Sequence, residues 1–192
     1  MSTKYLTDAA QDEAEITAFC KLLRDEGVRS YLEVGSKFGG SLWRVASSLP
    51  AGSRIVSVDL PGGTKAWKES EASLTACHEA IRKLGHDTHC IWGNSTDPRI
   101  IAQVKALGPF GCTLLDGDHR RDGVVKDFET YGPMSTMVAF HDVAWFRAST
   151  WEGTRIDVGD FWNHLRPQYE RTMEFRYDTS FKNNGIGVLW RC

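Results

Sequence analysis

The sequence predicts a doubly wound α/β fold built on a mostly parallel sheet, and three observations support this prediction. Short apolar runs alternate along the chain with longer segments that show helical periodicity. The apolar runs are nearly continuous, as expected for strands whose two faces are both covered by helices. Turn residues separate the two kinds of segment, for example at Pro61, Gly62 and Gly63. When a helix connects two successive strands, it forms the crossover connection that parallel strands require, so the sheet is expected to be mostly parallel.

The first half of the chain contains three predicted strands and three predicted helices. Gly27 ends the first helix and Pro50 ends the second. The second strand is rich in β-branched residues and lies between Gly52 and the turn at Pro61. The predicted elements are the helix Ala9–Glu26, the strand Ser30–Val34, the helix Ser41–Ser48, the strand Arg54–Val58, the helix Lys65–Leu84 and the strand Thr88–Trp92.

The second half continues the alternation and ends in two strands. Asp97 is a suitable N-cap and Pro98 suits the first position of the helix that follows it. Residues Val143–Ile156 are rich in aromatic residues and have no clear period, which predicts a loop that either covers the substrate or packs its aromatic residues into the core. The other predicted elements are the strand Thr113–Leu115, the helix Arg121–Tyr131, the strand Met137–Phe140, the helix Val158–Leu165 and the strands Arg171–Tyr177 and Gly185–Arg191.

Length and composition indicate one globular domain over residues 1–192. The net charge of -2 argues against a nucleic-acid partner, and no apolar stretch approaches the length of a membrane span. The N-terminal residues lack the apolar core of a signal peptide. The five cysteines are scattered and odd in number, which is typical of reduced thiols. We therefore expect a cytoplasmic protein without nucleic-acid or membrane partners, and a homodimer is left open.

A glycine-rich turn follows the first predicted strand, and three nucleotide-binding motifs compete for it. A P-loop requires lysine at the position of Ser41, and a dinucleotide fingerprint requires glycine at the position of Lys37. The pattern that fits is E-x-G-x-x-x-G-x-S, which begins at Glu33 and includes Gly35. A carboxylate at Glu33 would repel a pyrophosphate, whereas it suits a ligand that carries a sulfonium and an ammonium group.

Polar residues also follow the other predicted strands. Asp59 ends the second strand at the offset expected for an acid that binds ribose hydroxyls, although it could simply cap the next turn. Asn94 and Ser95 follow the third strand. The fourth and fifth strands end in the sequences Leu-Leu-Asp-Gly-Asp-His and Ala-Phe-His-Asp. If these two strands are neighbours, the acids and imidazoles that follow them lie close together at the carboxyl ends of the strands. These residues are Asp116, His119, His141 and Asp142.

These motifs together resemble the class I S-adenosylmethionine-dependent methyltransferases, and in particular the small O-methyltransferases of the catechol, caffeoyl-CoA and macrolide-sugar branch. The resemblance covers residues Ser30–Val143. It implies a Rossmann-like, seven-stranded sheet with an antiparallel C-terminal strand. It also implies a set of cofactor-binding residues, in which Asn94 or Ser95 meets the adenine. That set is Glu33, Gly35, Ser36, Gly39, Ser41, Asp59, Asn94, Ser95 and Asp116.

The resemblance implies a divalent metal held by Asp116, His141 and Asp142, but His141 stands where a carboxylate is usual. Mg²⁺ prefers oxygen ligands and imidazole suits transition metals better, so two alternatives are open. Either a softer ion binds, or His119 or His141 is a general base in a site without metal. The catalytic residues expected on either alternative are Asp116, His119 and His141.

The function expected from this resemblance is methyl transfer from S-adenosylmethionine to a hydroxyl of a small molecule. Two other functions are weighed against it. An NAD-dependent oxidoreductase is disfavoured by Glu33 and Lys37. A catalytically silent cofactor-binding module that acts through partners is disfavoured by the retention of the expected polar residues. The identity of the methyl acceptor is not encoded in any motif.

Overall fold

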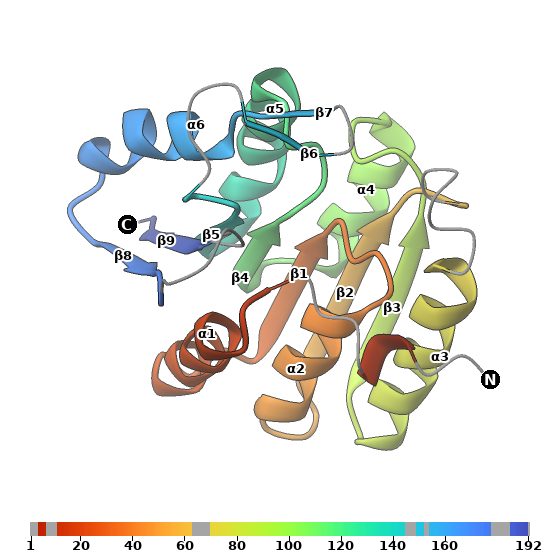
Figure 1. The fold of residues 1–192 in the computed structure, drawn as a ribbon. Helices are drawn as coiled ribbons and strands as arrows, with labels where there is room; N and C mark the ends of the chain where they lie inside the picture. Colours follow the sequence, from red (N-terminus) through yellow and green to blue (C-terminus); the bar gives the residue numbers. More distant parts are fainter. Residues whose placement is uncertain are drawn as a thin grey trace.

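A seven-stranded sheet forms the centre of the fold, with strand order β3-β2-β1-β4-β5-β9-β8 (Figure 1). The computed structural model describes residues 4–6, 11–62, 70–144, 149–151, 154–177 and 185–191. The first five of these strands are parallel, β9 is antiparallel to β5, and β8 is antiparallel to β9. The predicted antiparallel C-terminal strand is therefore confirmed. The strands are β1 (Ser30–Val34), β2 (Arg54–Asp59), β3 (Asp87–Trp92), β4 (Phe110–Leu115), β5 (Ser135–His141), β8 (Thr172–Phe175) and β9 (Ile186–Trp190).

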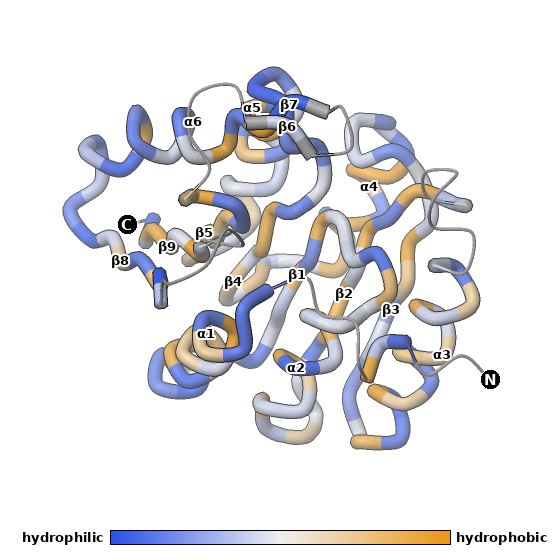
Figure 2. The backbone as a smooth tube through the Cα atoms, in the orientation of Figure 1, coloured by the Kyte–Doolittle hydropathy of each residue, from blue (hydrophilic) through white to orange (hydrophobic). Residues whose placement is uncertain are grey.

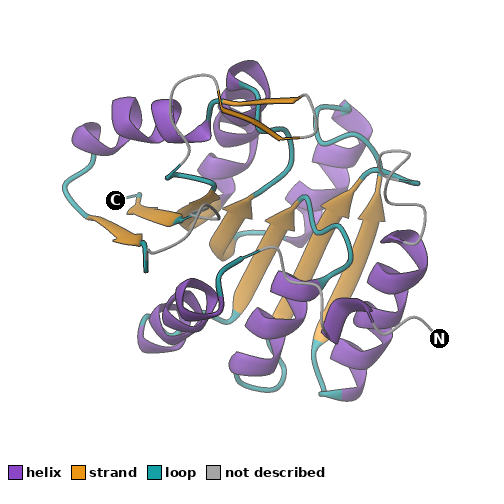
Figure 3. Ribbon diagram, viewed as in Figure 1, coloured by secondary structure: helices purple, strands orange, loops and turns teal. Residues whose placement is uncertain are grey.

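Helices cover both faces of this sheet, as a doubly wound fold requires (Figure 3). One apolar core lies between the sheet and α1, α2 and α3, and a second core lies between the sheet and α4, α5 and α6. The helices are α1 (Glu13–Asp25), α2 (Gly40–Ser48), α3 (Ser70–Lys83), α4 (Pro98–Leu107), α5 (Arg121–Tyr131) and α6 (Val158–Leu165). Short 3₁₀ helices are η1 (Lys4–Leu6), η3 (Gly132–Met134) and η4 (Arg166–Gln168).

The strand order fixes where a ligand can bind. The chain leaves β1 toward β2 on one side, whereas β4 lies on the other side of β1. Connections therefore diverge at the carboxyl ends of β1 and β4, and ligands of open α/β sheets bind at such a switch point. The glycine-rich turn and the fourth-strand motif lie at this edge.

Most sequence-predicted elements are present, and the differences have local causes. The first helix begins at Glu13 rather than Ala9, because the Asp12 side chain caps it by accepting a hydrogen bond from Ala14 N–H at 2.8 Å. The fourth strand begins at Phe110 rather than Thr113. The expected start of the third helix, residues 65–69, lies outside the described residues.

The prediction of a loop over Val143–Ile156 is wrong in part. This segment contains a two-stranded antiparallel hairpin formed by β6 (Ser149–Trp151) and β7 (Thr154–Ile156). Strands of three residues are too short to show an alternating pattern in sequence, so the pattern gave no sign of them. Residues 145–148 and 152–153 of the predicted substrate cover lie outside the described residues.

Hydropathy follows the same layered architecture (Figure 2), with apolar residues on the strands and hydrophilic ones on the outer sides of the helices. Among the helices that the structure describes, none combines the length and the apolar character that a membrane crossing requires.

Candidate functional site

The glycine-rich turn joins the end of β1 to the start of α2. Gly35 and Gly39 have φ angles of 85° and 88°, in the left-handed region that favours glycine. A Cβ atom on Gly35 would lie 2.3 Å from the backbone oxygen of Asp116, so a larger residue would force the turn away from β4. Gly39 is the N-cap of α2 and provides no side-chain cap. The turn is thus a backbone cradle that a ligand can approach closely, directly beside the end of β4.

Asp59, at the end of β2, holds this turn in place. Its Oδ2 atom accepts hydrogen bonds from the backbone N–H groups of Ser36 at 2.8 Å and Lys37 at 2.5 Å, and Oδ1 accepts one from Leu60 N–H at 2.7 Å. Burial raises the pKa of Asp59, and these backbone donors oppose the rise. A carboxylate has about four acceptor positions, so one remains for a ribose hydroxyl. The ribose role stays a prediction.

Glu33 lies beneath the turn and is fully buried. Its carboxylate accepts hydrogen bonds from the Tyr31 hydroxyl at 2.8 Å and the Ser41 hydroxyl at 2.9 Å. Burial raises the pKa of Glu33 to about 7, although these hydrogen bonds favour the ionised form. Two neutral donors compensate the charge only in part, so a cation bound nearby would stabilise the carboxylate.

The predicted adenine residues follow β3, and both have partners within the chain. Asn94 Oδ1 accepts hydrogen bonds from the backbone N–H and the hydroxyl of Thr96, each at 2.9 Å. The Ser95 hydroxyl donates to Asp127 at 2.8 Å, and the Tyr131 hydroxyl donates to the Ser95 carbonyl at 2.6 Å. These bonds fix the shape of the loop, and the adenine contact remains a prediction.

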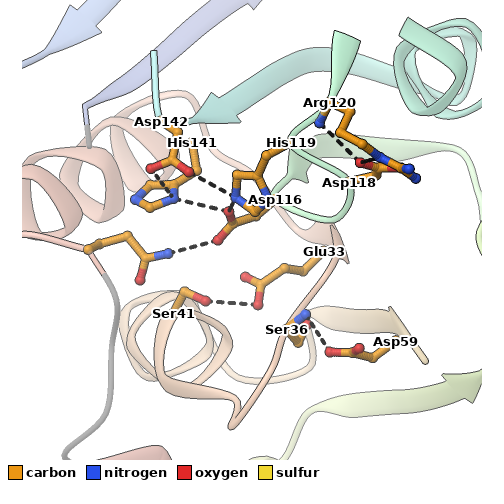
Figure 4. A network of polar contacts seen from close by, with 11 residues as sticks. Glu33, Ser36, Ser41, Asp59, Asp116, Asp118, His119, Arg120, His141 and Asp142 are labelled. Atoms are coloured by element: carbon orange, nitrogen blue, oxygen red, sulfur yellow. Dashed lines mark hydrogen bonds and ion pairs between the residues drawn. The ribbon is translucent and has the colours of Figure 1, made fainter. Parts of the chain in front are cut away.

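Four charged or titratable residues meet at the carboxyl ends of β4 and β5, which are hydrogen-bonded neighbours (Figure 4). Asp116 and His119 follow β4, His141 ends β5, and Asp142 comes next. His141 Nδ1 lies 3.0 Å from Asp116 Oδ1, and His119 Nε2 lies 2.8 Å from Asp142 Oδ2 and 3.2 Å from Asp116 Oδ1. One ligand atom from each residue lies within 4.8 Å of the others. The structure thus brings together the four acids and imidazoles expected at the ends of these two strands, and we call them the Asp–His cluster.

Burial makes the interactions within the Asp–His cluster strong. The side chain of His141 is 3% exposed and that of His119 is 25% exposed, so His119 lies nearer to solvent. Burial alone would lower the pKa values of both histidines, but the carboxylates of Asp116 and Asp142 raise them to about 10 for His119 and about 9 for His141. Burial alone would raise the pKa of Asp116, but the His141 charge and the hydrogen bonds with both histidines hold it well below its ordinary value.

The backbone at Asp142 is strained. Its φ angle is 63°, in the left-handed region that residues other than glycine seldom adopt. Such a conformation costs on the order of 1–3 kcal/mol and is concentrated at functional sites. Here it accompanies a 6% exposed residue whose carboxylate contacts both His119 and His141. This backbone conformation places the Asp142 carboxylate in the cluster, as its second acid.

Sequence reasoning missed two buried polar residues near the start of α1: Gln11, which precedes the helix and contacts the cluster, and Glu15 within the helix. Gln11 is 8% exposed, and its Nε2 group donates to Asp116 Oδ2 at 3.1 Å. Glu15 is fully buried on the face of α1 that carries Ile16 and Phe19. An acid among the apolar positions of a helix is a signal that sequence reading could have used.

A third missed residue, Asp157, links the cluster to the β6–β7 hairpin. It follows β7, and its backbone N–H donates to the His119 carbonyl at 2.8 Å. Its Oδ2 atom accepts from Arg121 N–H at 3.2 Å, at the start of α5. The hairpin and α6 are thereby connected to the backbone that carries His119.

The chemistry of the Asp–His cluster follows from its composition. Two carboxylate and two imidazole groups with ligand atoms this close can surround a divalent cation, and the mixed oxygen and nitrogen donors fit a transition metal. Without a cation, the raised pKa values keep the imidazoles protonated at neutral pH, as partners of the carboxylates. A protonated imidazole does not accept a proton from a substrate.

Comparisons with known proteins identify the family and the fold. A family model described as a methyltransferase domain matches residues 32–143. No curated protein matches the sequence. The structure is similar to the O-methyltransferase TomG from Streptomyces achromogenes, involved in tomaymycin synthesis and solved with S-adenosylmethionine, with a TM-score of 0.73 at 16% identity, covering 98% of this chain and 86% of that chain.

Two further solved structures share the fold. An O-methyltransferase from Bacillus cereus in complex with S-adenosylhomocysteine has a TM-score of 0.68 at 18% identity, covering 94% of this chain and 82% of that chain. A methyltransferase from Geobacter sulfurreducens has a TM-score of 0.59 at 12% identity, covering 94% and 79%. These likenesses confirm the predicted Rossmann-like fold.

Proposed function

The chain belongs to the methyltransferase-domain family, and on that premise we propose that it transfers the methyl group of S-adenosylmethionine to a hydroxyl of a small molecule, with a divalent metal held by the Asp–His cluster. The observation that carries the proposal is the contact between the two halves of the site, which are the glycine-rich turn and the Asp–His cluster. The glycine-rich turn lies against the backbone of Asp116, and the side chain of Asp116 belongs to the cluster. A ligand in the turn would therefore present its reactive group to the cluster.

The residues around the turn fit the cofactor. S-Adenosylmethionine carries a ribose, a carboxylate, an ammonium group and the sulfonium that supplies the methyl group. Glu33 gives the turn negative charge, which suits the cationic groups, and Asp59 retains acceptor capacity for ribose hydroxyls. The open N-terminus of α2, capped by Gly39 without a side chain, suits a carboxylate.

The residues of the Asp–His cluster fit the acceptor side of the reaction. Methyl transfer is an in-line displacement, so the protein aligns the acceptor oxygen with the methyl carbon and helps to remove the acceptor proton. Asp116, His119, His141 and Asp142 would hold the metal, which as a Lewis acid lowers the pKa of a bound hydroxyl. The exposed edge of the cluster, at His119, is where an acceptor can enter.

The alternatives fit less well. Membership of a methyltransferase family leaves the oxidoreductase without support, and Lys37 stands where the dinucleotide fingerprint needs glycine. A histidine acting as general base is disfavoured because the carboxylates raise the pKa values of His119 and His141 to about 10 and about 9, so that both rings are protonated at neutral pH. A silent module is disfavoured because the chain retains the expected polar residues and the fold assembles them into one cluster.

Chelation and metal replacement test this proposal. We expect EDTA to abolish methyl transfer to hydroxylated acceptors, and Mn²⁺, Co²⁺ or Zn²⁺ to restore it better than Mg²⁺, because the cluster offers imidazole donors. The variant His141→Asp should shift the preference toward Mg²⁺ by restoring an oxygen ligand. His164→Asp is the matched control, since His164 is exposed on α6 and does not belong to the Asp–His cluster.

Activity that resists the chelator and survives both His119→Ala and His141→Ala would refute the metal assignment and the general base together. No methyl transfer with any acceptor, combined with no binding of S-adenosylhomocysteine, would refute the function itself.

A further inference from the structure

Ser95, in the loop after β3, is held by two residues of α5 that lie one helical turn apart. The Tyr131 hydroxyl donates to the Ser95 carbonyl at 2.6 Å, and Asp127 Oδ1 accepts from the Ser95 hydroxyl at 2.8 Å. Both α5 residues are buried, whereas Ser95 is partly exposed. Ser95 is thus fixed from within the protein, in the loop that the adenine of the cofactor is expected to contact.

The direction of the hydrogen bond between Ser95 and Asp127 follows from the surroundings of the carboxyl group. The backbone N–H of Asp118, which can only donate, also bonds to Asp127. Burial raises the pKa of Asp127 to about 6, and the hydrogen bond from Ser95 opposes that rise, so the carboxylate is largely ionised at neutral pH. An ionised carboxylate only accepts hydrogen bonds. The Ser95 hydroxyl therefore donates its single proton to Asp127 and has only lone pairs left for a ligand.

The neighbouring Asn94 has the opposite polarity. Its Oδ1 atom accepts hydrogen bonds from the backbone N–H and from the hydroxyl of Thr96, each at 2.9 Å. A backbone N–H always donates, so the amide atom that faces it is the oxygen. The Nδ2 group, which carries two N–H donors, is the end of this exposed side chain that remains for a ligand. The loop after β3 therefore offers a ligand a donor at Asn94 and an acceptor at Ser95.

We propose that Asp127 is a positioning residue that makes the Ser95 hydroxyl an acceptor and so gives this loop its preference for adenine over hypoxanthine. This inference rests on the proposed function. Adenine has an amino group that donates and, beside it, a ring nitrogen that accepts. The Ser95 oxygen accepts from that amino group, and the Asn94 amide donates to the ring nitrogen. Hypoxanthine has a carbonyl oxygen in place of the amino group, so its lone pairs would face those of Ser95 and repel them.

Asp127 also contacts the loop after β4, so its replacement affects more than Ser95. A Cβ atom on Gly117 would lie 3.2 Å from Asp127 Oδ2, and the next residue, Asp118, donates its backbone N–H. Loosening of these contacts would lower the affinity for every nucleoside ligand alike. A change in the orientation of the Ser95 hydroxyl instead alters the ratio of affinities for two ligands that differ only in the base. That ratio therefore separates the positioning role from a purely structural one.

The test compares S-adenosylhomocysteine with S-inosylhomocysteine, in which a carbonyl replaces the amino group of the base, by calorimetry at a pH well above the pKa of Asp127. The wild-type protein should bind the adenine ligand about 100-fold more tightly or better, because the hypoxanthine ligand leaves polar groups of the site unpaired. In Asp127→Asn, the amide can turn its oxygen or its NH₂ group toward Ser95, so the preference should fall by about tenfold or more.

A double-mutant cycle shows whether Asp127 acts through Ser95. Ser95→Ala should lose a similar part of the preference, and the variant that combines Asp127→Asn with Ser95→Ala should lose no more of it than Ser95→Ala alone. Asp122→Asn is the matched control, since Asp122 is exposed in the first turn of the same helix, and its preference should equal that of the wild type.

The possible outcomes distinguish this inference from the proposed function. If the wild-type protein binds both ligands equally well, or if Asp127→Asn loses affinity for both in the same proportion, the inference is overturned while the proposed function stands. Additive losses in the combined variant also overturn it, because Asp127 would then act independently of Ser95. If the wild-type protein binds neither ligand, the proposed function fails. If Asp127→Asn does not fold, Ser95→Ala decides, since an unchanged preference in that variant overturns the inference.

Discussion

The two halves of the site neutralise their carboxylates in different ways. At the glycine-rich turn, Asp59 and Glu33 accept hydrogen bonds from neutral groups, namely backbone N–H groups and two hydroxyls. In the Asp–His cluster, Asp116 and Asp142 are paired with imidazoles. The first arrangement fixes the shape of the turn, and its neutral donors leave the charge of an ionised carboxylate uncompensated. The second pairs opposite charges with one another, and the proposed cation would have to replace these contacts. Gln11 and the strained backbone at Asp142 help to hold this arrangement.

The variant Asp116→Asn should have the largest effect, because Asp116 contacts both histidines and borders the turn. We expect the rate of methyl transfer to fall by about 100-fold or more, in the range found for groups that assist proton removal. Affinity for S-adenosylhomocysteine should change far less, because the turn is held by Asp59.

Asp118→Asn is the matched control for this prediction. Asp118 lies two residues further along the same loop and pairs with the exposed Arg120, at 2.5 Å from its Nη2 atom. An equal loss of activity in both variants, measured as methyl transfer to the same acceptor, would contradict the special role of Asp116.

Asp59→Asn should act on the other half of the site. It replaces the oxygen acceptors of the turn and the expected ribose partner, so affinity for S-adenosylhomocysteine should fall by about 1.5–3 kcal/mol, or roughly 10- to 150-fold. Calorimetry measures the change. Asp87→Asn is the control, since Asp87 pairs with Arg54 at the opposite, amino end of β3. Unchanged affinity in Asp59→Asn would remove Asp59 from the cofactor site.

A smaller effect is expected from pH, through Glu33. Burial raises its pKa to about 7, so the carboxyl is largely protonated below that pH and ionised above it. A cationic ligand favours the ionised form. Affinity for S-adenosylmethionine, which carries cationic sulfonium and ammonium groups, should therefore rise with pH up to about pH 7 and level off above it, by no more than about tenfold for each unit by which binding shifts the pKa. Glu33→Gln should give a flat profile, and a profile equally steep in both proteins would contradict the role of Glu33.

The comparison of the two halves also explains what the sequence could predict. The turn from Glu33 to Ser41 and the acid at Asp59 are local patterns, in which neighbouring residues set the backbone, so the turn could be predicted from spacing, and its ligand contacts stay a prediction. The convergence of Asp116 and His141 followed once two strands were taken as neighbours. The contacts of Gln11 with Asp116 and of Asp157 with the His119 backbone could not be predicted, because these residues reach the cluster from the segment before α1 and from the end of a three-residue strand.

The central claim is that the turn and the Asp–His cluster form one site for a methyl donor and a metal. A crystal structure of the protein with S-adenosylhomocysteine and Mn²⁺, with anomalous scattering recorded for manganese, tests this claim most directly. We predict the nucleoside at the turn, with its ribose against Asp59, and an anomalous peak within about 2.3 Å of His141 Nδ1 and of at least one carboxylate oxygen. Nucleoside density without a peak at the cluster would contradict the metal, and an empty turn at saturating ligand would contradict the account as a whole.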